Sequence, residues 1–208
     1  MQPSNLQPLG KIVRLQIQRA SLKLGQKPNR YYDPAALLPV EALTLTPPGA
    51  VAFLPDGSAV MDVHHAAHPR TRTMDGVNDL SVGFTGHYAR LRARYGLHLA
   101  DGCAGENILV ENPDQIELST LQHGLTIQSA VSGAWVRLQQ VAVALPCVEF
   151  SAYAARQPGP AATKAALQFL DHGLRGFYCV FEEPGSASVA LGDTVYALRD
   201  ENANHPGL

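Results

Sequence analysis

The stretch "GCAGENILVE", residues 102–111, holds polar groups in a setting that suits ligand binding. Gly105 would let the backbone turn tightly and come close to a bound molecule. Glu106 and Asn107 follow at the entrance of a predicted strand, where a buried acid with a raised pKa could move a proton and an amide could bind a ligand. The alternative is an ordinary turn in which Asn107 ties down its own backbone.

The stretch "LPCVEF", residues 145–150, places Cys147 directly after Pro146 and after the longest apolar run of the chain. Because proline cannot donate to a sheet ladder, we expect the strand to stop there and to leave Cys147 ordered but reachable. A thiolate is a nucleophile and a soft metal ligand. The alternative is a buried core cysteine. Cys103, in the glycine-rich loop, and Cys179, within "FYCVF", are predicted to be dispensable.

Two groups of arginines could hold an anion. Arg175 lies between Gly173 and Gly176 just before a predicted strand, and a guanidinium held in this way suits a phosphate or a carboxylate. A structural ion pair is the alternative for this residue. Arg70 and Arg72 belong to the polar segment "VHHAAHPRTRTM" and could serve a phosphate-bearing ligand.

The same polar segment contains His64, His65 and His68. His64 and His68 have the i, i+4 spacing of a helical zinc pair. However, no HExxH motif is present, and Pro69 would break a helix at this point. A zinc site is therefore the weaker alternative to a polar loop.

The elements that must position these residues are mainly strands. Strands are predicted at 11–18, 41–46, 106–111, 114–119, 124–130, 134–145, 176–182, 187–193 and 194–199, with a hairpin at 49–63. Helices are predicted at 84–96, 149–156 and 161–173, and an irregular connector at 29–40. In the first strand, Val13, Leu15 and Ile17 should share one face and Arg14, Gln16 and Gln18 the other. The meander order argues against parallel βαβ winding and favours a β-barrel.

The composition excludes several classes of protein. The 208 residues are 46% hydrophobic and 16% charged, with a formal net charge of -2, so nucleic-acid binding has no electrostatic support. No apolar run could span a membrane and no signal peptide is evident, so we expect a cytoplasmic protein. The three cysteines form no CxxC pair, which fits a reducing compartment. We expect one domain over residues 1–200 and a disordered polar tail over 201–208.

Taken in order, these stretches resemble the MOSC family, the molybdenum cofactor sulfurase C-terminal domain. The matching residues are Gly105, Glu106, Asn107, Cys147, Gly173, Arg175, Gly176, Tyr178, Gly192 and Asp193. The resemblance covers residues 10–198 and implies a β-barrel with a few small flanking helices. It also implies that the protein handles the molybdenum cofactor and that Cys147 carries sulfur or binds molybdenum. Many relatives have a Gly-Gly-x-Asp-Arg-Ala-type segment, to which only His64 or His65 and Arg70 could correspond here.

The resemblance leads to three hypotheses. The first is a molybdenum-cofactor-binding reductase of small N-oxygenated substrates. Its site would comprise Cys147 as the metal ligand, Glu106 as a proton shuttle, and Asn107, Arg175, Arg70, His64 and Gly105 as cofactor contacts. No flavin, nicotinamide or iron–sulfur motif is present, so a separate electron-donating reductase is expected. The second is a sulfur carrier that holds a persulfide on Cys147 for a cofactor-sulfurating partner. The third is a non-catalytic module that binds or delivers the cofactor.

Overall fold

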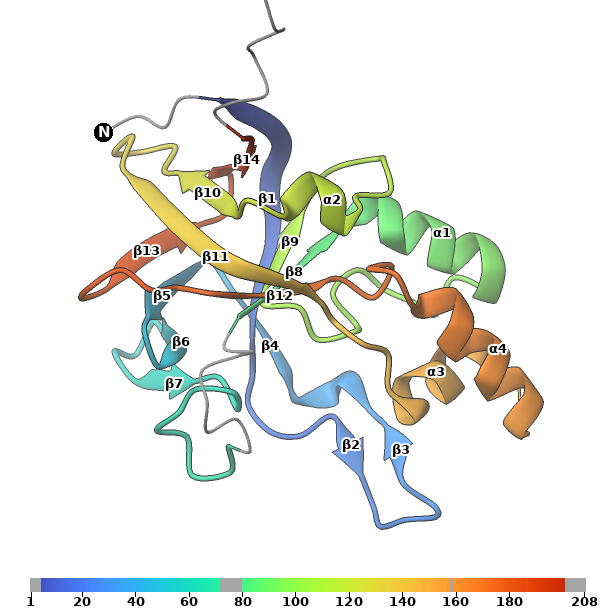
Figure 1. The fold of residues 1–208 in the computed structure, drawn as a ribbon. Coiled ribbons are helices and arrows are strands. Elements are labelled where there is room, and N and C mark those ends of the chain that lie inside the picture. Colours follow the sequence, from blue (N-terminus) through green and yellow to red (C-terminus); the bar gives the residue numbers. More distant parts are fainter. Residues whose placement is uncertain (1–4, 72–79, 158, 201–208) are drawn as a thin grey trace, which may run out of the picture.

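The computed structural model describes residues 5–71, 80–157 and 159–200 of the chain, and its centre is a closed β-barrel (Figure 1). Seven strands form the ring in the order β14-β10-β11-β12-β8-β9-β1, and pairing between β1 and β14 closes it. The strands are β1 (Leu6–Gln18), β8 (Leu80–Phe84), β9 (Ile108–Val110), β10 (Leu125–Gln128), β11 (Trp135–Val143), β12 (Phe177–Val180) and β14 (Thr194–Leu198). The predicted mainly β barrel is confirmed.

Further strands extend the barrel and pack on its core. β4 (Leu37–Val40) pairs with β1, and a second sheet has the order β13-β5-β6-β7. Its strands are β5 (Ala42–Thr46), β6 (Gly49–Phe53), β7 (Ala59–Met61) and β13 (Ala187–Ala190). β6 and β7 form the predicted hairpin. Leu45 and Val189 of the second sheet belong to the same buried cluster as Leu15, Val82 and Phe177 of the barrel, so the two sheets share one core.

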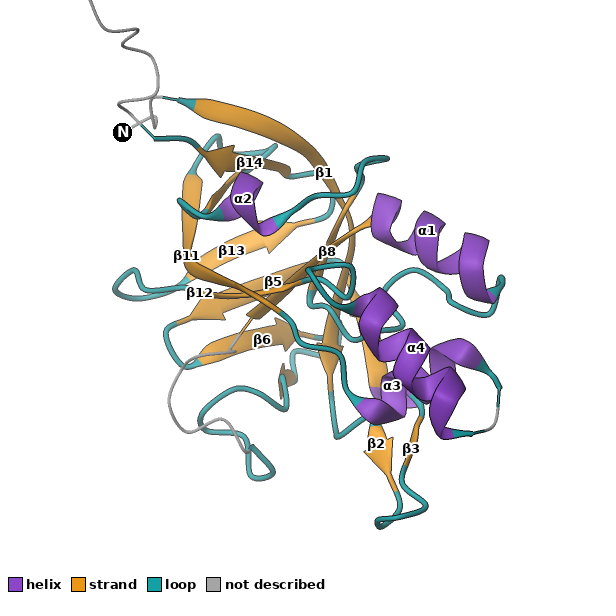
Figure 2. Cartoon of the chain, turned by 45° about the vertical axis from the view of Figure 1, so that its right-hand side comes forward, coloured by secondary structure: helices purple, strands orange, loops and turns teal. Residues whose placement is uncertain are grey.

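The described residues contain the 3₁₀ helix η1 (Pro34–Ala36) and the α-helices α1 (Thr85–Tyr95), α2 (Leu118–Leu121), α3 (Val148–Ala155) and α4 (Pro160–Leu170). α1, α3 and α4 lie on one side of the barrel, whereas α2 lies apart from them, against β11 and β14 (Figure 2). The prediction for α1 is confirmed: Tyr88 and Leu91 are buried, and Gly96 ends the helix with a φ of 106°. A short hairpin, β2 (Lys23–Leu24) with β3 (Tyr31–Tyr32), packs on the same side, since Tyr32 and Phe150 belong to one buried cluster.

Several local predictions were wrong. Val13 is 44% exposed, because the register of β1 shifts between Ile12 and Arg14 and brings Ile12 into the core instead. The connector at 29–40 contains β3, η1 and β4, and residues 114–119 form no strand.

The most consequential omission was β8. Leu80, Val82 and Phe84 alternate with Ser81 and Gly83, but the strand has only five residues and contains a glycine, which weakens the strand signal. β8 also pairs in parallel with β9 through the intervening α1, contrary to the expectation of no parallel winding.

The predicted tail and Arg72 lie outside the described residues. Within the described ranges, no helix has the length and apolar character needed to cross a bilayer.

Candidate functional site

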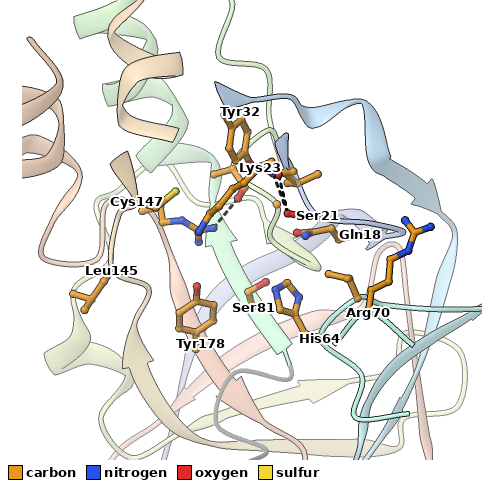
Figure 3. Close-up of a pocket in the computed structure, with 15 residues that line it drawn as sticks. Gln18, Ser21, Lys23, Tyr32, His64, Arg70, Ser81, Leu145, Cys147 and Tyr178 are labelled. Atoms are coloured by element: carbon orange, nitrogen blue, oxygen red, sulfur yellow. Dashed lines mark hydrogen bonds between the residues drawn. The ribbon is translucent and has the colours of Figure 1, made fainter. Parts of the chain in front are cut away.

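A cavity of about 200 Å³ opens at the side of the barrel that faces α3 and the β2–β3 hairpin (Figure 3). The structure brings five of the seven predicted site residues to its lining: His64, Arg70, Gly105, Cys147 and Arg175. They come from segments far apart in the sequence, and these segments meet because the barrel closes. Glu106 and Asn107 are not among the lining residues of the described chain.

Cys147 lies at the pocket on the N-terminal end of α3. β11 ends at Val143, and Cys147 then adopts an extended conformation and acts as the N-cap of the helix. Its Sγ accepts a hydrogen bond from the backbone N–H of Phe150 at 3.5 Å. The unpaired N–H groups of a helix N-terminus favour negative charge, so this position suits a thiolate. The thiol is partly exposed, as a reactive group requires.

The other two cysteines differ sharply from Cys147. Cys103 and Cys179 are buried, and burial raises the pKa of each thiol to about 12. The charge of Glu106 raises the pKa of Cys103 further. Both thiols therefore remain protonated at neutral pH, and neither lines the pocket within the described chain.

Arg175 presents an incompletely bonded guanidinium to the pocket. Its Nη2 donates to the carbonyl oxygen of Ala104 at 2.8 Å, whereas its Nη1 is buried without a hydrogen-bond partner among the described residues. Burial alone would lower the pKa of Arg175, but attraction to Tyr178 and Glu106 outweighs it and raises the pKa, so the group stays charged. A buried donor of this kind costs free energy unless something binds it. The arrangement suits an anionic ligand.

The glycine-rich loop is held against the barrel by a buried glutamine. Gln16 of β1 donates through Nε2 to the carbonyl oxygens of Gly102 and Glu106, both at 2.7 Å. Gly105 has a φ of +96°, and a Cβ there would lie 3.0 Å from Cδ1 of Leu22. A side chain at this position would therefore strain the loop that forms the pocket wall. The alternation pattern placed Gln16 on the polar face but did not indicate this role.

Glu106 lies behind the pocket wall. Its Oε2 accepts a hydrogen bond from the Tyr88 hydroxyl at 2.6 Å, and that hydroxyl accepts one from the backbone N–H of Ala104 at 3.0 Å. Burial raises the pKa of Glu106, although the charge of Arg175 and the Tyr88 hydrogen bond oppose the shift. The carboxyl group thus supports the loop rather than facing the cavity.

All polar atoms of the Asn107 side chain are used within the protein. Its Oδ1 accepts from the backbone N–H and the hydroxyl of Ser81, both at 3.1 Å. Its Nδ2 donates to the carbonyl oxygen of Gln16 at 3.2 Å and to Oδ2 of Asp62 at 2.8 Å. Asn107 therefore links β9, β8 and β1 and has no donor left for a ligand.

Asp62 is a further residue of the site that the sequence did not indicate. It is fully buried, and its Oδ1 accepts from the backbone N–H of His64 at 2.9 Å and contacts His64 Nδ1 at 2.7 Å. Burial alone would raise the pKa of Asp62, but these bonds and one from the Gln18 N–H lower it, so the carboxylate is ionised. The only sequence signal was an acid at the end of a hairpin strand, just before two histidines.

The histidine segment does not form a metal cluster. His65 is buried and its Nδ1 accepts from the backbone N–H of Ala67, while His68 Nδ1 accepts from that of Arg70. Across the described ranges, no group of three His, Cys, Asp or Glu side chains could hold a metal ion. The zinc alternative therefore has no support there. Arg70 itself is exposed at the pocket rim.

The barrel and this pocket define a recognised class of domain. The MOSC domain family matches residues 78–196, more than half of the chain, and the chain belongs to this family. Membership associates the protein with the molybdenum cofactor.

Two solved structures share the fold. The YUAD protein from Bacillus subtilis has a TM-score of 0.57 and 16% identity, covering 93% of this chain and 100% of that one. A structure described as a hypothetical protein has a TM-score of 0.53 and 12% identity, covering 94% of this chain and 70% of that one. No curated protein sequence matches the chain.

Proposed function

We propose that the protein binds the molybdenum cofactor in this pocket, with Cys147 as the thiolate ligand, and reduces small N-oxygenated substrates. The observation that supports this proposal is the meeting of two groups on one cavity. The partly exposed thiol of Cys147 provides a soft metal ligand. The buried Nη1 of Arg175, which has no partner among the described residues, provides a hydrogen-bond donor for an anion.

The residues of the pocket fit an anionic cofactor. Arg175 would hold a phosphate oxygen through Nη1, and Arg70 and Lys23, which line the same pocket, would add positive charge at its rim. Gly105 would let the loop backbone approach the pterin closely. When bound, the cofactor supplies two-electron redox chemistry. The chain itself contributes the ligand, its orientation and the surrounding charge.

The reaction requires a partner for electrons. Removal of oxygen from an N-hydroxylated base consumes a pair of electrons and two protons and releases water. We therefore propose a separate electron-donating reductase as the partner and a small molecule as the substrate.

The test is metal analysis of the full chain produced in a molybdenum-competent host, with Cys147→Ser and the matched control Cys179→Ser. Molybdenum in the wild type and the control, and its loss together with turnover in Cys147→Ser, would support the proposal. Reductant-released sulfane sulfur without molybdenum would instead support the sulfur carrier. Cofactor binding without either turnover or sulfane sulfur would support a delivery module.

A further inference from the structure

We propose that His64 is the proton-transfer residue of this pocket, and that Asp62 and Asn107 are positioning residues that hold its ring. This inference rests on the proposed function and extends it, since it assigns the proton step to a residue other than Glu106.

The contacts of His64 fix which ring nitrogen faces the ligand. Nδ1 lies 2.7 Å from Oδ1 of Asp62, and an ionised carboxylate can only accept, so Nδ1 carries a proton and donates it. The backbone N–H of His64 donates to the same oxygen at 2.9 Å. Nε2 has no hydrogen-bond partner within the described part of the chain, and His64 lines the pocket. Nε2 is thus the nitrogen free to act on a ligand.

Asp62, which binds the ring of His64, is itself held by hydrogen bonds behind the pocket. The second oxygen of Asp62 accepts from Nδ2 of Asn107 and from the backbone N–H of Gln18, both at 2.8 Å. Asn107 therefore acts on the site through Asp62, because its own polar atoms never reach the cavity. A carboxylate held by several donors cannot rotate freely, and it fixes the plane of the imidazole in turn.

His64 is also better placed than Glu106 for exchange with solvent. Its side chain is 34% exposed, whereas Glu106 is 3% exposed and bound to Tyr88. Figure 3 shows His64 and Cys147 on different walls of the same pocket, so both side chains border one cavity. Arg70, Arg175 and Lys23 also line the pocket and can supply positive charge, whereas the imidazole of His64 can both accept and donate a proton.

The proton step balances within the reduction. The N–O bond of the N-hydroxylated substrate breaks, and the reductase partner supplies the pair of electrons. The oxygen leaves as water after it receives a proton from Nε2 of protonated His64, and the nitrogen takes the second proton from solvent. His64 then regains its proton from solvent through its exposed edge.

The first test needs no cofactor: nitrogen NMR of the histidine rings in the full chain, with the His64 signals assigned by their loss in His64→Asn. We expect neutral His64 in the Nδ1–H form, and a shift toward the Nε2–H form in Asp62→Ala, which removes the acceptor of Nδ1–H. An Nε2–H ring in the wild type would overturn the proposed geometry.

The second test uses cofactor-loaded protein, a chemical reductant and an N-hydroxylated aromatic base. In His64→Asn the amide can keep the bond to Asp62 but provides no titratable nitrogen, so turnover should fall by about 100-fold or more at unchanged molybdenum content. His68→Asn, on the same segment but off the pocket lining of the described chain, should keep its rate.

The two proposals fail in different ways. A loaded His64→Asn variant at full rate would contradict this inference alone. Loss of molybdenum in step with activity would make His64 a cofactor contact and also contradict it. A wild-type protein that binds no molybdenum would contradict the proposed function itself.

Discussion

Arg175 offers the sharpest separation between a structural and a ligand-binding role. In Arg175→Lys the positive charge remains but the planar fork is lost. A lysine ammonium could replace Nη2 at the carbonyl oxygen of Ala104, or it could reach a ligand in place of Nη1. Because it is a single point of charge, it cannot do both with the geometry of the guanidinium.

The expected effects of Arg175→Lys on cofactor affinity and on stability follow from the bonds of these two nitrogens. A hydrogen bond to a charged group contributes about 1.5–3 kcal/mol. Loss of such a bond to the ligand corresponds to about a 10- to 150-fold rise in the dissociation constant. In the cofactor-free protein the substitution should lower the free energy of unfolding by only about 1–2 kcal/mol. The effect is smaller because Nη1 has no hydrogen-bond partner there among the described residues. In a domain of this size such a loss lowers the melting temperature by about 2–8 °C.

The assay measures the molybdenum-to-protein ratio after gel filtration and the melting temperature of cofactor-free protein side by side. The control is Arg94→Lys: Arg94 lies 4.4 Å over the Phe169 ring centroid, away from the pocket, so its replacement should lower stability but not cofactor content. If Arg175→Lys behaved like this control, the phosphate role of Arg175 would be refuted and only a structural role would remain.

Three further predictions concern the thiols and a buried histidine. Iodoacetamide should label Cys147 in the cofactor-free native protein, mapped by mass spectrometry, because the other two thiols are buried with pKa values of about 12; an unlabelled Cys147 would argue for a core role. Cys103→Ala and Cys179→Ala should keep their molybdenum content, with a stability loss of about 1 kcal/mol for Cys179; loss of metal in either would indicate a two-thiol site. Burial lowers the pKa of His87 from 6.5 to about 4. Between pH 6.5 and pH 4 the unfolded chain therefore binds more protons at this residue than the folded chain does. Stability should therefore fall by about 2 kcal/mol from pH 7 to pH 5, and urea titrations should show a smaller fall in His87→Gln.

The parts of the fold that the sequence predicted are those set by local patterns. Alternating strands, the hairpin at 49–63 and the helix ended by Gly96 all follow from neighbours within a few residues. β8 was not found in this way, because its pattern covers only five residues and Gly83 weakens it as a strand signal. The exposure of Val13 follows from a bulge, which the apolar pattern does not record.

In the candidate site, too, residues marked by a local pattern could be predicted, and residues fixed by distant contacts could not. Cys147 could be singled out because Pro146 predicted that the strand stops before it, although β11 already ends at Val143. Gln16 and Asp62 could not, because the side-chain bonds that fix them in place reach residues distant in the sequence. Gln16 binds residues 86 and 90 positions away, and Asp62 binds Asn107, 45 positions away. Such pairs become visible only once the barrel brings their strands together.

The ordered residues that resemble the MOSC family therefore have two kinds of physical role. Cys147, Gly105 and Arg175 line the pocket. Asp193 instead binds the backbone N–H groups of Ala130 and Ala190, both at 2.8 Å, and so ties together loops at another part of the fold. Since a buried carboxylate with unmatched oxygens is costly, these bonds give Asp193 a role in folding that does not depend on the ligand. A family pattern of this kind thus identifies the barrel more firmly than the reaction. On our proposal, the reaction would depend on the thiol of Cys147 together with two nitrogens at the pocket that have no partner among the described residues, Nη1 of Arg175 and Nε2 of His64.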